Sequence, residues 1–539
     1  MPKHYRSLTV LFAVWLLGWL FLSWPTMQDD AFIHLRYAVH LLRYHMISYD
    51  GVHPDYGTSS LLYVWLLAGL RCLTNSPVMP RALSSLFHLL LFAGLAWEFP
   101  KALRAAPRPA WTFAILLLGI LVTPMAVRWL DDGMETSLTL CLITLLAFAV
   151  SRLGHAEIFR NRSMAWLASL GFLATVARVE YLLLMTVASM TLFFASSERM
   201  GANPAPSTER TGKPGSDSNR ARLGVRQVSL CGSPLAGGLV AAGLIYATMH
   251  SLLPDTAVAK ADLQISWADK LGVAFGVLKA GLSVFVSSMS IGIVLLLFWA
   301  LTLATLILYR RRLSPSILTA NSLFPVALAL AMWRGQEIQG VRYLLWTLVF
   351  PLLWNTLELR WSPSEPVPAA ARVLRFAAYG VAGLLLMLMP IESVLLFREF
   401  RIRETSLAEI RGQHLGRLHS MKLIAFDIGY IGYFTESPVC DLAGLVNGRA
   451  QARLSYQERV DRCAAERPQY AFLRATDLGA LNNSMSLKNW WICSVYDFAN
   501  LRGADLHYLI ASPAAAKQVC AAAGGTPRPA AALFSGGAE

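Results

Sequence analysis

Apolar segments of nearly equal length recur along most of the chain, and they constrain its fold more than any other feature. A helix needs about 20 consecutive apolar residues to cross the hydrocarbon core of a bilayer. The stretch 164–195 is too long for one crossing and contains Arg178 and Glu180, which predicts two helices that meet at a polar elbow. The remaining candidate crossings are 8–25, 80–98, 110–128, 134–151, 233–251, 284–308, 315–333, 341–358 and 376–397.

Composition supports a polytopic α-helical membrane protein. Hydrophobic residues make up 55% of the chain and charged residues only 15%, against about 25% charged in soluble domains. The net charge of +14 is divided among short basic clusters between apolar segments, so we interpret it as a topology signal rather than a nucleic-acid-binding surface. Lys3 and Arg6 precede the first apolar segment and no small-residue cleavage site follows it, which predicts a retained signal anchor.

The distribution of basic residues predicts the orientation in the membrane. The segment 59–73 has 15 residues, which is short for a crossing and suits an interfacial or re-entrant helix. If it does not cross, the basic clusters fall on one side, which the positive-inside rule assigns to the cytoplasm. We therefore predict about eleven transmembrane helices in a bacterial inner membrane, with a cytoplasmic N-terminus and a periplasmic or extracytoplasmic C-terminal domain. The clusters lie at 3–6, 101–108, 152–162, 196–231, 310–312 and 360–375.

A change of composition near residue 398 predicts two domains. Residues 1–398 form a transmembrane domain, within which 196–231 is rich in Pro, Ser, Gly and charge and indicates a flexible cytoplasmic loop. Residues 399–539 have a soluble-like composition with short strand-like segments, which predicts a small extracytoplasmic α/β domain. The expected strands are 422–426, 470–473, 491–496 and 508–510, and the residues from about 521 are expected to be frayed.

Four of the seven cysteines lie in the predicted C-terminal domain: Cys440, Cys463, Cys493 and Cys520. An oxidising compartment allows one or two disulfides among them, and the sequence leaves the pairing open. The chain has no CxxC or Cys/His spacing of the zinc type, no Walker loop, no GxGxxG and no GxSxG. Zinc-site, nucleotide-loop and serine-hydrolase chemistry therefore lack support.

The predicted topology places charged residues from distant segments on the outer face. Asp29 and Asp30 directly follow the first crossing, where carboxylates beside hydrocarbon are costly. Sugar transfer from a lipid phosphate needs a carboxylate to deprotonate the acceptor hydroxyl and cations to hold the leaving phosphate. Arg contacts phosphate through two hydrogen bonds and Lys as a point charge. The other residues on this face are Asp131, Asp132, Glu135, Arg178, Glu180, Asp255, Lys260, Arg334, Glu337 and Arg342.

Each of these residues also has a purely structural interpretation. Asp29, Asp30 and Glu135 lie where a carboxylate caps a helix N-terminus. An Arg–Glu pair at a helix break neutralises itself, and a basic residue beside an apolar segment extends to water or head groups. Scattered histidines on an interfacial loop are expected at the surface rather than around a metal ion. The Arg–Glu pair is Arg178 with Glu180, and the basic residues beside apolar segments are Lys260 and Arg342. The scattered histidines are His34, His40, His45 and His53.

Several motifs, in order along most of the chain, resemble one family. DDAFIHLRYA at 29–38 and YDGVHPDYGTSS at 49–60 are similar to the first outer loop of GT-C-fold membrane glycosyltransferases, which use polyprenyl-phosphate sugars. The resemblance is to mycobacterial-type arabinofuranosyltransferases, and more distantly to protein mannosyltransferases and lipid A aminoarabinose transferases. The further motifs are DGMET at 132–136, ARVE at 177–180, LPDTAVAK at 253–260, Arg342-Tyr343, and AFDIGYIGYF at 425–434 followed by DLAGLV at 441–446.

The resemblance implies a GT-C-like catalytic domain over 1–398 that transfers a sugar, with inversion, from a polyprenyl-phosphate carrier. The acceptor would be a cell-envelope glycan, lipid or protein, and no nucleotide-binding loop is required. One carboxylate of the pair acts as general base, with Asp29 favoured and Asp30 orienting the acceptor or a cation. A divalent cation (Mg²⁺ or Mn²⁺) near the pair is an open alternative. The implied substrate-binding residues are Arg36, Tyr56, Glu135, Arg178 and Glu180, with Lys260 and Arg342 on the donor phosphate.

Departures from the family pattern leave the sugar and the acceptor undetermined. The segment 57–60 lacks the Pro and Trp of the family element, Val179 replaces a Pro, and Asp255 replaces an Asn. Two other functions stay open. A flippase or transporter for a lipid-linked glycan predicts ionisable residues within crossings and repeat symmetry. A glycan polymerase or ligase acts on lipid diphosphates and typically has a large outer loop between late crossings.

Overall fold

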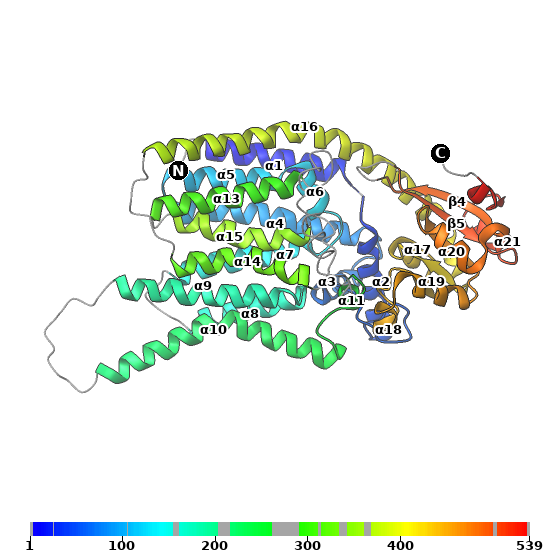
Figure 1. Ribbon diagram of the computed structural model, residues 1–539, viewed down its shortest axis with the longest axis horizontal. Helices are drawn as coiled ribbons and strands as arrows, with labels where there is room; N and C mark the ends of the chain where they lie inside the picture. Colours follow the sequence, from blue (N-terminus) through cyan, green and yellow to red (C-terminus); the bar gives the residue numbers. More distant parts are fainter. Residues whose placement is uncertain are drawn as a thin grey trace.

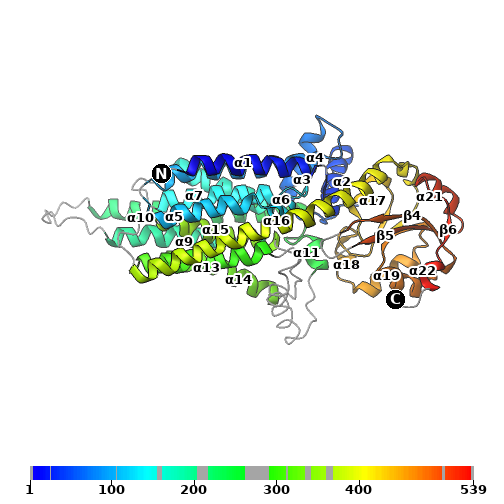
Figure 2. The same ribbon diagram turned by 90° about the horizontal axis from the view of Figure 1, so that it is seen from above.

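A computed structural model describes residues 4–24, 26–104, 106–154, 161–202, 216–260, 290–310, 314–333, 342–359, 368–499 and 504–535. Long helices run side by side in a bundle, and a smaller α/β domain lies against one end of it (Figure 1). Between the two lie α2 (Asp29–Tyr44), α3 (Leu61–Arg71) and α11 (Asp255–Ala259). Figure 2 shows the same arrangement from a second side.

The bundle helices follow most of the predicted apolar segments. Within the described residues, six helices are long and apolar enough to cross a membrane, or seven if α5 and α6 form one broken crossing. Figure 1 shows α8, α13, α14 and α15 running alongside them, so the structure supports a multi-pass bundle without establishing eleven crossings. The bundle helices are α1 (Tyr5–Leu22), α4 (Met79–Ala102), α5 (Arg108–Leu121), α6 (Pro124–Leu130), α7 (Thr136–Gly154), α8 (Asn161–Ala177), α9 (Tyr181–Ala202), α10 (Ser216–Met249), α13 (Ser290–Arg310), α14 (Pro315–Trp333), α15 (Arg342–Glu358) and α16 (Pro368–Gly412).

Three bundle features refine the predictions. The expected elbow between two helices is present, because α8 ends at Ala177 and α9 begins at Tyr181. The expected single crossing 110–128 is instead α5 and α6, bent by 67°. Thr123 caps α6 by accepting a hydrogen bond from the Ala126 amide, and Pro124 lacks the amide hydrogen needed to continue α5. In the predicted loop 196–231, α9 extends to Ala202 and α10 begins at Ser216, while 203–215 lie outside the described residues.

The predicted domain boundary at 398/399 falls inside one continuous helix. Helix α16 has 45 residues, about 68 Å at 1.5 Å per residue, and carries the chain from the bundle into the C-terminal domain. Buried Glu399 lies at this passage. Its Oε1 accepts hydrogen bonds from Arg128 Nε and Nη2 at 3.0 and 2.7 Å, and Arg403 Nε lies 3.3 Å from the same oxygen. This ion pair fixes α16 against α6.

The C-terminal domain contains a six-stranded mixed sheet with the order β2-β1-β3-β5-β4-β6. Strand β1 pairs in parallel with β2 and β3, and the remaining pairs are antiparallel. Four strands match the predicted ones, while β2 and β6 were not predicted. The strands are β1 (Leu423–Ala425), β2 (Val439–Asp441), β3 (Tyr470–Arg474), β4 (Trp491–Asp497), β5 (Leu506–Ala511) and β6 (Arg528–Pro529).

Short helices cover the sheet, and two disulfides fasten them to it. Cys440 in β2 is joined to Cys463 in α19, and Cys493 in β4 is joined to Cys520 in α21. Because of the second disulfide and β6, the expectation of frayed residues from about 521 is wrong for the described part of that segment. The helices are α17 (Gly429–Thr435), α18 (Gly448–Ala452), α19 (Tyr456–Ala465), α20 (Leu478–Met485), α21 (Ala516–Ala522) and α22 (Ala532–Ser535), with 3-10 turns at Leu415–Leu418 and Leu487–Asn489.

Candidate functional site

Helix α2 begins with the Asp pair and separates the bundle from the C-terminal domain. Gln28 donates its amide hydrogen to Asp132 O at 2.9 Å, which attaches the start of α2 to the DGMET loop. Gly133 in that loop has φ +87°, and a Cβ there would lie 2.8 Å from Ala31 Cβ. Glycine is therefore required for α2 to approach this closely.

One face of α2 contacts the C-terminal domain, and Asp29 lies on it. Gly429 N donates to Asp29 Oδ2 and Tyr430 N donates to Oδ1, both at 2.7 Å. Burial raises the pKa of Asp29 well above its usual range, and nearby Asp427 raises it further, against the effect of the two amide hydrogens. A Cβ on Gly429 would lie 1.9 Å from the Asp29 carbonyl oxygen, so this contact also requires glycine.

Arg36 lies on the same face, two turns along the helix. Its Nη1 donates to Gly432 O at 2.5 Å and its Nη2 to Ser437 O at 3.0 Å. The guanidinium carbon also lies 4.3 Å from the centre of the Tyr49 ring. Arg36 is 3% exposed. The structure therefore places this predicted substrate-binding residue at the domain interface, where it binds backbone carbonyls near the end of α17.

Asp30 and His34 are four residues apart and therefore share a face of α2, which differs from the face of Asp29 and Arg36. Asp30 is half-buried. His34 is buried, with Nδ1 2.8 Å from Thr58 Oγ1 and Nε2 3.3 Å from Glu135 Oε2. His34 therefore contacts both the DGMET loop and the segment around Thr58.

Glu135 is the centre of a buried charged cluster. Its Oε1 accepts hydrogen bonds from Ser59 Oγ at 2.9 Å and from Arg178 Nη1 at 3.1 Å. Arg178 Nε donates to Glu180 Oε1 at 2.6 Å, which joins the DGMET and ARVE motifs. Burial raises the pKa of Glu135, but hydrogen bonding from His34 and the Arg178 charge outweigh it and leave the pKa below its usual range. Glu135 is therefore a carboxylate at neutral pH.

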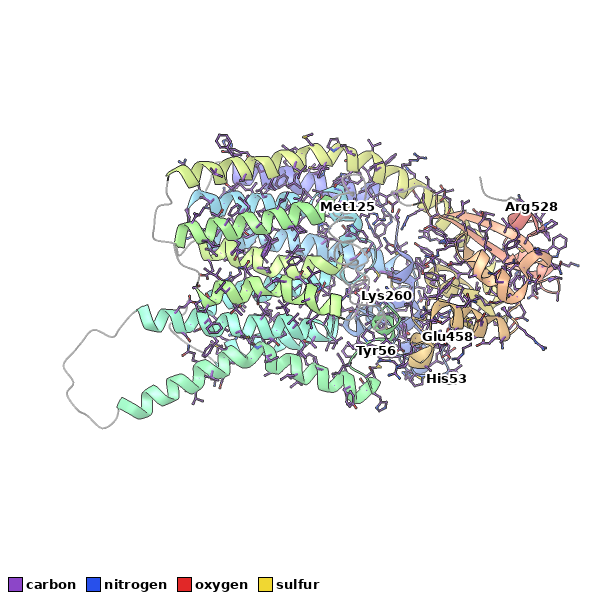
Figure 3. All side chains as sticks on the ribbon, viewed as in Figure 1. His53, Tyr56, Met125, Lys260, Glu458 and Arg528 are labelled. Atoms are coloured by element: carbon purple, nitrogen blue, oxygen red, sulfur yellow. A yellow bond between two sulfur atoms is a disulfide. The ribbon has the colours of Figure 1, made fainter. Side chains whose placement is uncertain are left out.

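Figure 3 shows Tyr56 and Lys260 at the end of the bundle that meets the C-terminal domain. Asp255 donates its amide hydrogen to Tyr56 O at 2.7 Å, which places α11 beside the segment 55–60. Its carboxylate accepts a 2.8 Å hydrogen bond from Arg449 Nε of α18. Lys260 follows α11 directly and is half-buried. The LPDTAVAK motif is thus fixed between the bundle and the C-terminal domain.

Five other residues predicted for the outer face either lie outside the Glu135 cluster or have side chains outside the described part of the structure. Asp131 is fully buried with His88, whose Nδ1 lies 2.6 Å from Asp131 Oδ2, and Asp132 is 4% exposed, so neither forms an outer surface. Arg342 begins α15 but its side chain lies outside the described part, as do Arg334 and Glu337. Within the described ranges, no three His, Cys, Asp or Glu side chains gather in a metal-binding arrangement.

Sequence reasoning missed His34, Thr58 and Ser59 as members of the cluster. The expectation that the four early histidines lie at the surface is wrong for His34 and His40, which are 2% and 5% exposed. It holds for His45 and His53. The signal available in the sequence was the spacing of four between Asp30 and His34, which puts both on one side of a helix. The Glu135 contact joins positions 101 residues apart and had no local signal.

Comparisons with known proteins give one family match, which lies in the C-terminal domain. Residues 399–517 match a family described as a domain of unknown function, DUF8728. No curated protein matches. The structure is similar to a crystal structure of ArnT from Cupriavidus metallidurans bound to undecaprenyl phosphate, with 14% sequence identity, a TM-score of 0.47, and coverage of 94% of this chain and 98% of that chain.

Proposed function

We propose that this chain is a membrane glycosyltransferase of the GT-C type. It transfers a sugar from a polyprenyl-phosphate carrier to an acceptor on the extracytoplasmic face, with inversion at the anomeric carbon. The observation that carries the proposal is the convergence of three family-like motifs. DDAFIHLRYA, DGMET and ARVE meet through contacts among His34, Glu135 and Arg178 at the end of an apolar helical bundle. A water-soluble acceptor and a lipid-anchored donor can meet at such a boundary.

The geometry favours Asp30 over Asp29 as the general base. Both oxygens of Asp29 accept backbone hydrogen bonds from α17, which assigns that carboxylate to domain docking. Asp30 lies on the face of α2 that carries His34 toward Glu135. In the transfer step the Asp30 carboxylate takes the proton of the acceptor hydroxyl. That oxygen forms the new bond to the anomeric carbon as the bond to the lipid phosphate breaks.

The remaining charges suit the two substrates. Glu135 and Glu180 accept hydrogen bonds from sugar or acceptor hydroxyls, and Arg178 orients both carboxylates through hydrogen bonds. Lys260 and Arg342 neutralise the lipid phosphate that leaves. A divalent cation near Asp29 and Asp30 stays an open alternative, and no step is assigned to it.

The membrane orientation belongs to the same proposal. Two disulfides in the C-terminal domain suit an oxidising compartment such as the periplasm, and the basic clusters between apolar segments of the sequence suit the cytoplasm. Helix α3 has 11 residues, about 16 Å, which is too short to cross a ~30 Å hydrocarbon core. Both features support an outer-face site that accepts a cell-envelope glycan, lipid or protein.

Separate Asp29→Asn and Asp30→Asn variants test the proposal. Purified full-length protein in nanodiscs is supplied with synthetic polyprenyl-phosphate arabinose, mannose and aminoarabinose, and with envelope acceptors. We expect Asp30→Asn to lower kcat by about 10²–10⁴-fold, the usual contribution of a general base. Asp29→Asn should retain most of kcat but unfold at a lower temperature, because an Asn amide cannot accept both α17 hydrogen bonds.

Three outcomes contradict the proposal in different ways. Absence of wild-type transfer from every lipid-monophosphate donor removes the reaction class. Transfer from lipid diphosphates alone points to a polymerase or ligase instead. If Asp30→Asn keeps full activity and Asp29→Asn loses activity at unchanged stability, Asp29 is the general base.

A further inference from the structure

His34 is a buried imidazole at the centre of the candidate site, and the reaction described above assigns it no part. Its side chain is 2% exposed. Its two nitrogens contact different elements, Thr58 of the first outer loop and Glu135 of the DGMET loop. The ring meets Tyr63 of α3 edge-on, with 5.5 Å between ring centres. Because one ring nitrogen's partner sets the proton position on the other, these contacts determine which tautomer Glu135 meets.

The hydrogen bonds of Thr58 select that tautomer. Ser60 N donates to Thr58 Oγ1 at 3.3 Å, so the hydroxyl oxygen already acts as an acceptor. The hydroxyl proton then has two acceptors within reach, His34 Nδ1 at 2.8 Å and Ser60 O at 3.4 Å. The shorter contact takes the proton, which leaves the ring proton on Nε2. The result is a directed chain from the Thr58 hydroxyl through the His34 ring to the Glu135 carboxylate.

Glu135 depends on this chain for the position of its second oxygen. Ser59 and Arg178 both contact Oε1. Oε2 is buried and, among the described residues, has no hydrogen bond of good geometry; His34 Nε2 lies 3.3 Å from it, within ion-pair distance. Without His34, only Oε1 is held, by Ser59 and Arg178, and the plane of the carboxylate is less restricted.

We propose that His34 is a positioning residue of the transfer reaction. It holds the Glu135 carboxylate in one orientation and keeps it ionised for a substrate hydroxyl. It also fixes the distance from Glu135 to the α2 face that carries Asp30. This inference rests on the proposed function and deepens it. Among the described residues, other titratable or charged groups around Glu135 are Arg178 and Glu180 at the elbow, Tyr63 on α3 and Tyr181 on α9.

His34→Gln and His34→Asn separate the two contacts. A glutamine amide nitrogen reaches the position of Nε2 and retains the Glu135 contact, whereas an asparagine amide oxygen reaches that of Nδ1 and retains only the hydrogen bond from the Thr58 hydroxyl. We expect His34→Asn to lower kcat by about 10- to 100-fold, the scale of a small misplacement in a site, with donor KM within about twofold. His34→Gln should keep kcat within about fivefold.

The pH profile of kcat/KM distinguishes a positioning role from a packing role, because a side chain that only fills space would leave the acidic limb in place. Loss of the Nε2 contact removes a donor that favours the charged form of Glu135, so its pKa rises. If transfer needs ionised Glu135, the acidic limb of kcat/KM should move to higher pH in His34→Asn and stay in place in His34→Gln. Equal losses in both variants with an unchanged acidic limb would overturn the proposal.

Two further variants keep the test decisive. Thr58→Val removes the hydroxyl that selects the tautomer, so it should move the acidic limb in the same direction by a smaller amount even if His34→Asn does not fold. An unmoved limb in Thr58→Val contradicts the directed chain. His40→Gln is the matched control, because His40 is also buried on α2 but contacts Ser48 O. It should leave the limb unchanged. Absence of transfer by the wild-type protein would instead contradict the proposed function. Failure of the positioning role and failure of the proposed function therefore give different results.

Discussion

At the residue scale, the adjacent Asp29 and Asp30 occupy different environments because an α-helix turns about 100° per residue. Asp29 accepts two amide hydrogen bonds from α17, while Asp30 shares a face with His34. Sequence reasoning favoured Asp29 as the base and gave Asp30 the orienting role, since nothing local shows which side of α2 a domain 400 residues later will cover. The contacts of Asp29 with residues 429 and 430 supply that information.

Substitution of Gly429 tests the docking role assigned to Asp29. In Gly429→Ala the new Cβ would lie 1.9 Å from the Asp29 carbonyl oxygen, so α17 must move away from α2. We expect destabilisation of about 1–3 kcal/mol, typical of overpacking, and faster proteolysis between the bundle and the C-terminal domain. Gly479→Ala is the control, because no atom lies within 4 Å of its Cβ. Equal unfolding temperatures for the two variants would contradict the tight contact.

His40 should make the stability of the protein depend on pH. Burial and the nearby Arg36 charge lower its pKa to about 4 from an ordinary value of about 6.5. A histidine with a lowered folded-state pKa stabilises the fold above its unfolded pKa, and this stabilisation is lost as pH falls through the window from about 6.5 to about 4. After allowance for solvent screening, we expect a loss of about 2 kcal/mol. Differential scanning calorimetry across pH 4–7 measures it, and His40→Gln should flatten that part of the curve; an equally steep curve in the variant refutes the assignment.

At the element scale, the lengths of the apolar segments predicted where most helices occur, but not the residues at which they begin and end. The elbow at Arg178 and Glu180 was predictable because two charged residues interrupt an apolar stretch longer than one crossing. The break between α5 and α6 was missed because Thr123 and Pro124 lie inside a uniformly apolar segment, where only local capping reveals it. Helix α16 passes the expected boundary at 398, and the ion pair with Arg128 of α6 lets its Glu399 side chain be buried there. Strand β2 was missed because three residues carry too little periodicity.

At the scale of the whole molecule, the C-terminal domain is attached to the site by contacts at several places. Asp29 and Arg36 bind the two ends of α17, and Arg449 binds Asp255 beside α11. Between them, Leu445 O lies against Gly57, where a Cβ would be 2.4 Å away. The contacts flank the segment 55–60 that carries Thr58 and Ser59. The domain therefore lies against the loop next to the Glu135 cluster.

This arrangement requires the site and the domain to share one side of the membrane, and the native cysteines allow a test. Cys72 is exposed directly after α3, at the end of the bundle that meets the C-terminal domain. Arg104 is exposed after α4, which is long enough to cross the bilayer. In intact cells with permeabilised outer membranes, a membrane-impermeant maleimide should label Cys72 but not an added cysteine in Arg104→Cys. That cysteine should react only after lysis, and Cys72→Ser sets the background. If Arg104→Cys is labelled from outside while Cys72 is protected, the candidate site faces the cytoplasm. Acceptor transfer in the envelope compartment would then be impossible, however well the charged cluster is built.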